Sequence, residues 1–221
     1  MTVAPVTPVA PAPWHLIAIT DDIHDGRDAL VARACAAARG GATMIQLRLK
    51  GADARLLADV AGALLAALPA SVPLVLNDRA DVALARGAAG VHLGHDDPPA
   101  AAVRRVAPPG FLIGASVGAD AEVPDAAGAD YVGIGPLYPT RSKSDAGSAI
   151  GLATFARLAQ MVGIPAVAVG GITAATAGDA MAAGAAGVAA VAAIFGAPDP
   201  ERAAHDVRSR IDAWVTRTTP S

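Results

Sequence analysis

The sequence predicts one α/β domain, a single (β/α)8 TIM barrel, on three observations. The chain has 221 residues, of which 53% are hydrophobic, so it can bury one sizeable core. From Trp14 onwards, short apolar runs alternate with alanine-rich stretches. A Gly-Ala pair recurs between an alanine-rich stretch and an apolar run, at 41–42, 87–88, 128–129 and 184–185. Glycine commonly ends helices and unbroken apolar runs are typical of buried parallel strands, so each pair indicates a passage from helix to strand.

The apolar runs predict the strands, and the alanine-rich stretches predict the helices. We expect strands within 15–20, 43–48, 72–76, 89–94, 111–115, 130–135, 165–169 and 186–191. Every interval between neighbouring runs has an alanine-rich stretch long enough for a helix, for example 28–39, 54–68, 80–86, 99–106, 152–161 and 173–183, and a final amphipathic helix is expected at 202–214. Eight short strands alternating with eight helices are typical of the closed barrel. The alternative is a doubly wound open sheet, which rarely has so many short strands so evenly spaced.

The amino-terminal segment and the overall charge limit the classes of function. Residues 1–13 alternate proline with small residues and are expected to form a flexible Pro/Ala-rich leader before a catalytic domain at 14–216. This leader lacks the pattern of a secretory signal, and no stretch reaches the ~18 apolar residues of a membrane span. A net charge of −3 argues against nucleic-acid binding, and the lone Cys35 cannot form an internal disulfide. We therefore expect a cytoplasmic protein with neither a membrane nor a nucleic acid as partner.

The chemistry of such a barrel belongs at the carboxyl ends of its strands. The second strand leads into Gln46-Leu47-Arg48-Leu49-Lys50. Because side chains alternate along a strand, the three polar residues share one face, which we expect at the barrel mouth, and the two leucines face the helices. Two neighbouring cations are suited to a polyanion such as diphosphate.

Carboxylates follow the next two strands. Asp78 follows the third strand, and Asp96 and Asp97 follow the fourth. Magnesium is usually held by one or two carboxylates, with water and phosphate oxygens completing its ligands. Each carboxylate is also explained as a helix cap, and the nearby His92 is equally explained as a core histidine. The carboxylates together, facing the two cations of the second strand, favour a metal–diphosphate site.

The sixth strand runs into the longest polar loop, 135–147. Its Thr140, Ser142 and Lys143 offer donors to phosphate oxygens, and long loops in compact domains are usually functional. A solvated surface loop is the alternative interpretation.

A second region suited to phosphate lies at the last two strands. Gly170-Gly171 follows the seventh strand, and residues 191–194 are expected to end the eighth. Glycines let backbone N–H groups approach an anion, and the loops after strands seven and eight of barrels frequently bind phosphate. Two such regions in one mouth indicate two phosphorylated substrates, or one substrate with two phosphorylated ends.

A series of motifs in this chain resembles the thiamine-phosphate synthase family. The motifs are QLRLK at 46–50, ND at 77–78, GVHLGHDD at 90–97, GAS at 114–116, GPLYPTRSK at 135–143 and AVGGI at 168–172. They occur in the family's order over nearly the whole chain. The resemblance implies a Mg²⁺-dependent transferase of thiamine biosynthesis. Such an enzyme joins 4-amino-2-methyl-5-(diphosphooxymethyl)pyrimidine to a thiazole phosphate, which yields thiamine phosphate and pyrophosphate.

The resemblance also implies a role for individual residues. The pyrimidine diphosphate would be held by Gln46, Arg48, Lys50, Asn77, Ser116 and Lys143, and Mg²⁺ by Asp78 and Asp97. The thiazole phosphate would be held by Thr140, Ser142, Gly171, Val191 and Ala192. The implied catalytic groups are Arg48, Lys50, Ser116 and Lys143. Diphosphate leaves readily once its charge is neutralised, so the absence of a catalytic triad agrees with this reaction.

The chain departs from the family pattern at several positions. Leu49 stands where the family usually has glutamate, and the sequence beginning at His95 is HDD in place of QED. Gly118 replaces a frequent histidine, and Ser142 replaces a threonine but keeps its hydroxyl. Ala192 replaces a serine, which removes one hydroxyl donor from the predicted thiazole-phosphate site.

Three other functions are weighed against this one. A thiazole tautomerase on the same barrel tends to lose the diphosphate and metal residues and carries a catalytic histidine where this chain has Pro136. A non-catalytic phosphate-binding regulator of thiamine metabolism has little need of both Asp78 and Asp97. A phosphosugar isomerase or epimerase needs an acid–base pair at opposing strand ends, and the sequence offers no convincing one. Monomers and homodimers of such a barrel are both compatible with the sequence.

Overall fold

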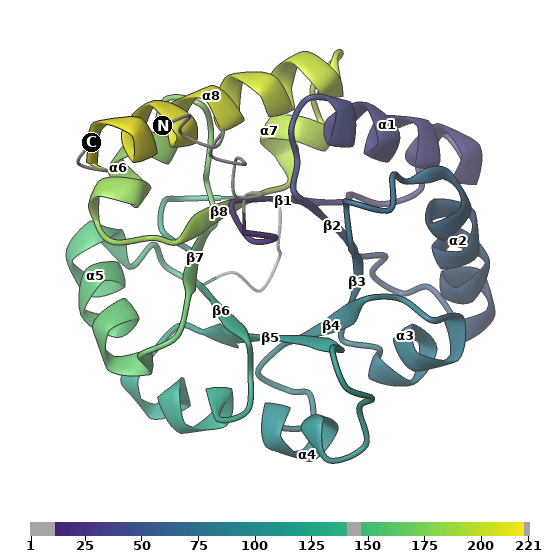
Figure 1. The fold of residues 1–221 in the computed structure, drawn as a ribbon, viewed down its shortest axis with the longest axis horizontal. Coiled ribbons are helices and arrows are strands. Elements are labelled where there is room, and N and C mark those ends of the chain that lie inside the picture. The colour runs from purple at the N-terminus through teal and green to yellow at the C-terminus, as the bar shows by residue number, and fades with distance from the viewer. Residues whose placement is uncertain (1–11, 141–146, 219–221) are drawn as a thin grey trace, which may run out of the picture.

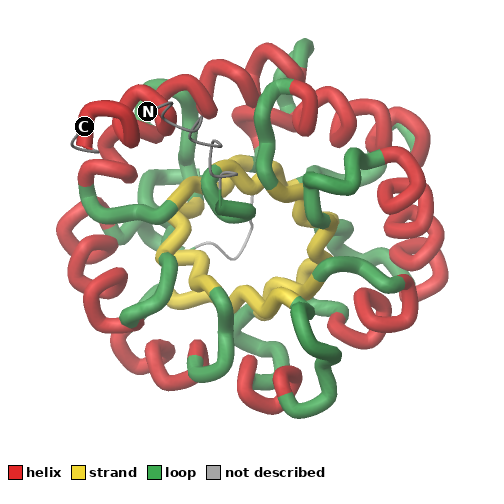
Figure 2. Tube along the Cα trace, in the orientation of Figure 1, coloured by secondary structure: helices red, strands yellow, loops and turns green. Residues whose placement is uncertain are grey.

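The protein, represented by a computed structural model that describes residues 12–140 and 147–218, is a closed barrel of eight parallel strands. The strands follow one another around the barrel in chain order, which confirms the predicted (β/α)8 fold. They form an inner ring that the helices surround (Figures 1 and 2). The strands are β1 (Leu16–Ile19), β2 (Met44–Leu47), β3 (Leu74–Asn77), β4 (Gly90–Leu93), β5 (Leu112–Val117), β6 (Tyr131–Ile134), β7 (Ala166–Val169) and β8 (Gly187–Ala190).

The helices agree with the alanine-rich stretches to within a few residues over most of the chain. They are α1 (Arg27–Arg39), α2 (Ala54–Ala67), α3 (Ala80–Arg86), α4 (Ala100–Arg104), α5 (Gly151–Val162), α6 (Ala177–Ala182), α7 (Ala192–Phe195) and α8 (Pro200–Thr218), with a 3-10 helix η1 (Asp120–Ala126) between β5 and β6. Residues 1–11 of the predicted leader lie outside the described residues.

Alternation along the strands divides the core into two parts. In β1, Leu16 and Ala18 belong to the large cluster between strands and helices, whereas Ile17 and Ile19 face the lumen. The lumen cluster consists of Ile17, Ile19, Met44, Val75, Tyr131, Val167 and Ala189. Burial of one large aliphatic side chain is worth about 1.5–3 kcal/mol, so the larger outer cluster supplies most of the hydrophobic stabilisation.

Two connections differ from the prediction. The element between β5 and β6 is the 3-10 helix η1 and contains Pro124, which has no N–H for an α-helical hydrogen bond. Residues 191–194 do not end the eighth strand: β8 ends at Ala190, and α7 begins at Ala192. The carbonyl of Val191 accepts the N–H groups of Ile194 at 3.0 Å and Phe195 at 2.8 Å, so the chain turns into a helix at once.

Residues 12–15, which lead into β1, close the amino-terminal end of the barrel. This segment lies inside the ring of strands in Figure 2. The ring centroids of Trp14 and Tyr131 are 6.3 Å apart in a stacked arrangement. A Cβ atom on Gly187 would collide with the carbonyl oxygen of Trp14, so glycine is needed for this close approach. The lumen is therefore covered at this end, and access is left to the carboxyl ends of the strands.

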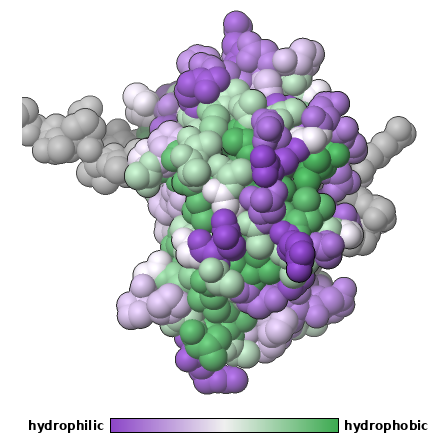
Figure 3. Space-filling model, turned by 90° about the vertical axis from the view of Figure 1, so that its right-hand side faces the viewer, coloured by the Kyte–Doolittle hydropathy of each residue, from purple (hydrophilic) through white to green (hydrophobic). Residues whose placement is uncertain are grey.

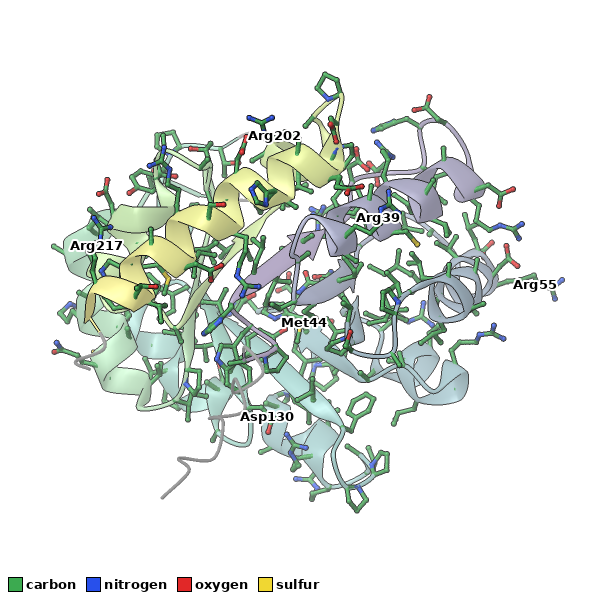
Figure 4. The ribbon with its side chains drawn as sticks, turned by 45° about the horizontal axis from the view of Figure 1, so that its top comes forward. Arg39, Met44, Arg55, Asp130, Arg202 and Arg217 are labelled. Carbon is green, nitrogen blue, oxygen red and sulfur yellow. The ribbon has the colours of Figure 1, made fainter. Side chains whose placement is uncertain are left out.

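The carboxyl-terminal helix α8 packs along α1, where Arg39 Nε lies 2.8 Å from Glu201 Oε2 (Figure 4). Glycine at position 40 permits the close approach, because a Cβ atom there would collide with the Glu201 carbonyl oxygen. The outer surface mixes polar and apolar side chains, as Figure 3 shows for one side of the helix ring. Within the described part of the chain, no helix combines the length and the hydrophobicity that a membrane crossing requires.

The tight contact between β4 and β5 predicts the stability of glycine variants. A Cβ atom on Gly90 would collide with the Leu112 carbonyl oxygen and lie 2.7 Å from Leu112 Cβ. We expect Gly90→Ala to lower the free energy of unfolding by about 1–3 kcal/mol because of this overpacking. Gly178→Ala in α6 is the control: nothing lies within 4 Å of its Cβ position, and alanine should raise the free energy by about 0.5–1 kcal/mol. Equal stabilities in urea denaturation would contradict this account.

Candidate active site

The strand register brings the predicted residues to one rim. Neighbouring strands pair Leu47 with Leu76, Asn77 with His92, Leu93 with Ala115 and Ser116 with Gly133. Arg48, Asp78 and Gly94 directly follow the ends of β2, β3 and β4, so they occupy adjacent places on the rim. Ser116 lies near the end of β5 at the same side of the barrel.

The end of β2 is held by Thr20, which directly follows β1. The Thr20 hydroxyl accepts the Arg48 N–H at 2.9 Å and donates to the Arg48 carbonyl at 3.0 Å. Arg48 is 7% exposed, and Lys50 is exposed at the start of the following loop. Gln46 lines a cavity in the lumen and Leu47 belongs to the outer cluster, so the predicted alternation is confirmed at these two positions. Sequence reasoning missed Thr20. Its role is the hydrogen bonding of its hydroxyl to the Arg48 backbone, and no sequence motif marks such a contact.

Two carboxylates converge around Gly94. A Cβ atom on Gly94 would lie 3.6 Å from Asp78 Oδ1 and 3.4 Å from Asp97 Oδ2, so the two oxygens are no farther apart than these distances combined. The Gly94 N–H donates to Asp97 Oδ2 at 2.7 Å and holds that carboxylate in place. Asp78 has φ +65°, and among the described residues it is the one non-glycine with a left-handed backbone. Its N–H donates to the His92 carbonyl at 2.8 Å, which fixes this unusual conformation.

The donor set of this pair fits a magnesium ion. Two carboxylates are the usual protein contribution to Mg²⁺, which takes its other oxygens from water and phosphate groups. Residues 12–140 and 147–218 contain no group of three or more His, Cys, Asp or Glu side chains that could hold a metal. Asp97 lines the mouth pocket, whereas Asp96 is exposed.

A pocket of about 140 Å³ opens between β4 and β5 at the mouth. It is lined by Leu93, Gly94, His95, Asp97, Pro98, Pro99, Ala100, Ala115, Ser116, Glu122 and Asp125. The Gly118 N–H donates to Glu122 Oε2 at 2.6 Å, which joins η1 to the end of β5. The three carboxylates of this lining make the pocket suitable for a cation or for an anion that brings one.

A smaller cavity of about 20 Å³ lies deeper, in the lumen. It is lined by Ile17, Ile19, Gln46, His92, Ser116, Tyr131, Gly133, Val167, Val169 and Ala189. Its lining is therefore mainly apolar, with a few polar groups, and its volume is enough for about one water molecule. Ser116 lines both this lumen cavity and the mouth pocket, so the two spaces adjoin at its side chain.

Buried polar side chains hold Ser116 from inside the barrel. His92 Nε2 lies 3.1 Å from Ser116 Oγ, and His92 Nδ1 lies 3.2 Å from the Tyr131 hydroxyl. A Cβ atom on Gly114 would lie 2.5 Å from His92 Nδ1, so glycine there makes room for the imidazole. Sequence reasoning gave Tyr131 no role; a polar residue on the inward face of an apolar strand is the signal that identifies it.

The loop after β6 is fastened to the end of β7. The Leu137 N–H donates to the Val169 carbonyl at 2.8 Å, and the Tyr138 N–H donates to the Gly170 carbonyl at 3.1 Å. Gly171 has φ +67°, and a Cβ atom there would lie 2.6 Å from Tyr138 Cβ. The Gly-Gly pair therefore permits the close packing of this loop against the end of β7.

The far end of the same loop is also anchored, by the Ile150 N–H, which donates to the Pro136 carbonyl at 2.9 Å. Thr140 is half-buried at the edge of the described part. The predicted site residues Ser142 and Lys143 lie outside the described residues.

The two predicted phosphate-binding turns are neighbours. Val169 pairs with Ala189, so Gly171 and Val191 each lie two residues beyond paired positions of β7 and β8. Val191 packs against the lumen cluster, and Ala192 is exposed as the first residue of α7. This arrangement brings the turn after β7 and the start of α7 to one part of the rim.

Comparison with known proteins identifies the family of this chain. The family model for "Thiamine monophosphate synthase" matches residues 16–194. The chain is 47% identical over 188 residues to a thiamine-phosphate synthase of Roseiflexus castenholzii, covering 84% of this chain and 82% of that protein. It is 39% identical over 205 residues to one of Desulfitobacterium hafniense, covering 91% and 97%. The structure of thiamine phosphate pyrophosphorylase from Pyrococcus furiosus superimposes with a TM-score of 0.80 at 33% identity, covering 92% and 98%.

The family model spans the barrel from the first residue of β1 into α7, and thus includes every rim position described above. The resemblance seen in the motifs is confirmed by these relatives, and the chain belongs to the thiamine monophosphate synthase family.

Proposed function

We propose that this protein is a thiamine-phosphate synthase, a transferase of thiamine biosynthesis. It condenses 4-amino-2-methyl-5-(diphosphooxymethyl)pyrimidine with a thiazole phosphate and releases pyrophosphate. The observation that carries the proposal is the pair of adjoining spaces at Ser116: a largely apolar cavity in the lumen and a carboxylate-lined pocket at the mouth. The polarity of the two linings matches a molecule with an aromatic ring at one end and a metal-bound diphosphate at the other. The ring would lie over the lumen cavity, which by itself has room for about one water molecule.

The diphosphate end is assigned to the mouth because the cations and carboxylates lie there. Arg48, whose backbone is fixed by Thr20, and Lys50 follow β2 beside the Asp78–Asp97 pair on the rim. Preorganised positive groups stabilise the charge that develops on a leaving diphosphate. Asn77, at the end of β3, and Lys143, in the part of the loop outside the described residues, keep their predicted roles in this proposal.

Mg²⁺ would be held by Asp78 and Asp97 together with diphosphate oxygens, since the donor set fits this ion. When bound, it would neutralise negative charge on the diphosphate. Within the chain, the Gly94 N–H donates to the Asp97 carboxylate, and the Asp78 backbone N–H donates to the His92 carbonyl. One backbone hydrogen bond thus holds the Asp97 carboxylate, and the other fixes the backbone from which the Asp78 side chain projects.

The reaction needs alignment more than acid–base chemistry. The bond between the pyrimidine methylene carbon and the diphosphate oxygen breaks, and its electron pair leaves with pyrophosphate. The thiazole nitrogen then donates its lone pair to the methylene cation and forms the new C–N bond. No proton transfer is obligatory, so the protein's task is to align two substrates and to exclude water from the cation.

The thiazole phosphate is assigned to the rim between β6 and β8. Thr140, Ser142, Gly171, Val191 and Ala192 are the proposed ligands. Backbone N–H groups at the Gly-Gly turn and at the start of α7 can serve the phosphate although Ala192 offers no hydroxyl. A cytoplasmic location and a homodimer stay predictions.

Removal of the Arg48 charge tests the diphosphate assignment. We expect Arg48→Gln to lower kcat by about 100-fold in a mass-spectrometric assay of thiamine phosphate, because one charge-stabilising group is lost. Arg55→Gln is the control, because it removes the same charge from a side chain on α2 that points away from the barrel (Figure 4). A solvated surface charge contributes little, so this variant should keep kcat within about twofold of the parent. Equal losses in both variants would contradict the assignment.

The metal assignment is tested by the dependence of the rate on Mg²⁺ concentration. Asp78→Asn and Asp97→Asn should each raise the concentration needed for half-maximal rate by about tenfold or more, since each loses a negatively charged ligand. Asp96→Asn is the matched control, because Asp96 is exposed and Asp97 lines the pocket. A shift in Asp96→Asn that equals the shift in Asp97→Asn would overturn the choice of ligand.

A further inference from the structure

Arg33, on α1, joins the loop after β1 to the end of α7. Its Nη1 and Nη2 atoms lie 3.2 Å and 3.0 Å from the two carboxylate oxygens of Asp21, so this ion pair is bidentate. Nη1 also donates to the Phe195 carbonyl at 3.2 Å. The guanidinium carbon lies 5.8 Å from the centroid of the Phe195 ring, over its face. One guanidinium group therefore contacts both the backbone and the side chain of the last residue of α7.

The Arg33–Asp21 pair is better shielded from solvent than the other ion pair of α1 described above. The side chains of Arg33 and Asp21 are 21% and 23% exposed, whereas those of Arg39 and Glu201 are 60% and 47% exposed. Exposed ion pairs contribute little because water and salt screen them. A shielded pair with the planar fork of arginine instead fixes its partners in one geometry. Arg33 is therefore suited to holding two segments in place.

Asp21 is the firmly held end of this contact. It directly follows Thr20, which is fully buried. The Thr20 N–H donates to the Gln46 carbonyl at 2.9 Å, and the Thr20 hydroxyl is bonded to the N–H and the carbonyl of Arg48. The chain just before Asp21 is thus tied to β2 without any help from Arg33. Through Asp21, the guanidinium of Arg33 has a fixed place relative to the diphosphate side of the rim.

The other end of the contact, α7, depends more on its surroundings. It spans only Ala192–Phe195 and lies beside α1 and β1 (Figure 1), and so short a helix is not stable by itself. Carbonyl groups in the last turn of a helix have no donor within the helix, and Arg33 supplies one to Phe195. The Phe195 N–H donates to the Val191 carbonyl at 2.8 Å. Because one hydrogen-bonded turn separates these two residues, a displacement of Phe195 would also displace Val191 and Ala192.

We propose that Arg33 is a positioning residue that places Val191 and Ala192 for the thiazole phosphate. This inference rests on the proposed function and adds to it a residue from the outer layer of helices. Arg33 holds α7 against the loop after β1, so the thiazole-phosphate side of the rim keeps a constant place relative to the diphosphate side. Loss of Arg33 should weaken binding of the thiazole phosphate and spare binding of the pyrimidine diphosphate, because Arg48 is held by Thr20.

This selectivity is tested by steady-state kinetics in which each substrate is varied in turn. We expect Arg33→Gln to raise KM for the thiazole phosphate by about fivefold to tenfold, the change that corresponds to loss of one hydrogen bond. KM for the pyrimidine diphosphate, and kcat with both substrates saturating, should stay within about twofold of the parent values. Equal rises in the two KM values, as a general structural defect would produce, would overturn the inference, and so would two unchanged values.

Arg39→Gln is the matched control. It removes the same charge from the same helix and breaks the exposed ion pair with Glu201. Both KM values should stay within about twofold of the parent, because an exposed pair contributes little. A rise in KM for the thiazole phosphate equal to that in Arg33→Gln would show that any lost charge on α1 has this effect, and would overturn the inference.

Arg33→Lys separates geometry from charge and also serves if Arg33→Gln does not fold. Lysine keeps the positive charge but lacks the planar fork that reaches both Asp21 oxygens and the Phe195 carbonyl together. KM for the thiazole phosphate should therefore rise in Arg33→Lys as well. A KM equal to that of the parent would show that charge is sufficient without the bidentate contact, and would overturn the positioning role.

Amide hydrogen exchange tests the same inference without any substrate. In Arg33→Gln we expect faster exchange of the Ile194 and Phe195 N–H groups, which close α7, and unchanged exchange of the Arg48 N–H, which donates to Thr20. Unchanged exchange in α7 would overturn the inference. Equally faster exchange at Arg48 would indicate general loosening of the barrel and would also overturn it.

The two kinds of measurement separate this inference from the proposed function. A parent protein that makes no thiamine phosphate contradicts the function and the substrate named here, and hydrogen exchange then decides by itself whether Arg33 holds α7. An active parent whose Arg33→Gln variant shows no selective rise in KM for the thiazole phosphate contradicts the inference alone.

Discussion

The pairing of β1 with β8 is the interaction on which the rest of the structure depends. Ile17 is level with Ala189 in this pair, and the hydrogen bonds between the two strands convert an open sheet into a ring. A closed sheet has no free edge, and all its carboxyl ends meet at one rim. Residues that are far apart in the chain, such as Arg48, Asp97 and Val191, thereby share a site although none of their strands is longer than a few residues.

Closure of the barrel also limits the volume of the lumen, and the free volume is distributed unevenly along the barrel axis. Near the amino-terminal end it is filled by Tyr131 and Met44 and covered by Trp14. Toward the mouth, small residues on the inward face, such as Gly133 and Ala189, leave a cavity beside polar side chains. Close packing at the amino-terminal end of the lumen therefore supports a partly polar space toward the mouth. In this way a small domain has both a hydrophobic core and room for a ligand.

The sequence was sufficient to predict the barrel, because the alternation of apolar strands with alanine-rich helices is visible in short stretches of the chain. The inward place of Gln46 followed from strand parity alone. The sequence did not predict η1, which contains Pro124, a residue without an N–H for an α-helical hydrogen bond. It did not predict α7 either, because a helix of four residues is too short to show a helical period. The contact of His92 with Tyr131 could not be predicted either, since it depends on the register of three strands and on two glycines that leave room for the imidazole. The assignments of Ser142 and Lys143 lie outside the described residues and stay predictions.

The left-handed backbone of Asp78 implies a trade-off at this position between the stability of the fold and the presence of a carboxylate on the rim. A non-glycine residue in that region carries a conformational cost of about 1–2 kcal/mol, which glycine would avoid. The substitution Asp78→Gly would therefore produce a more stable barrel that has lost a carboxylate from its rim. The aspartate at position 78 thus places a carboxylate on the rim against the thermodynamic preference of the backbone. Under the proposed metal role, a change from aspartate to glycine at position 78 would exchange metal binding for stability.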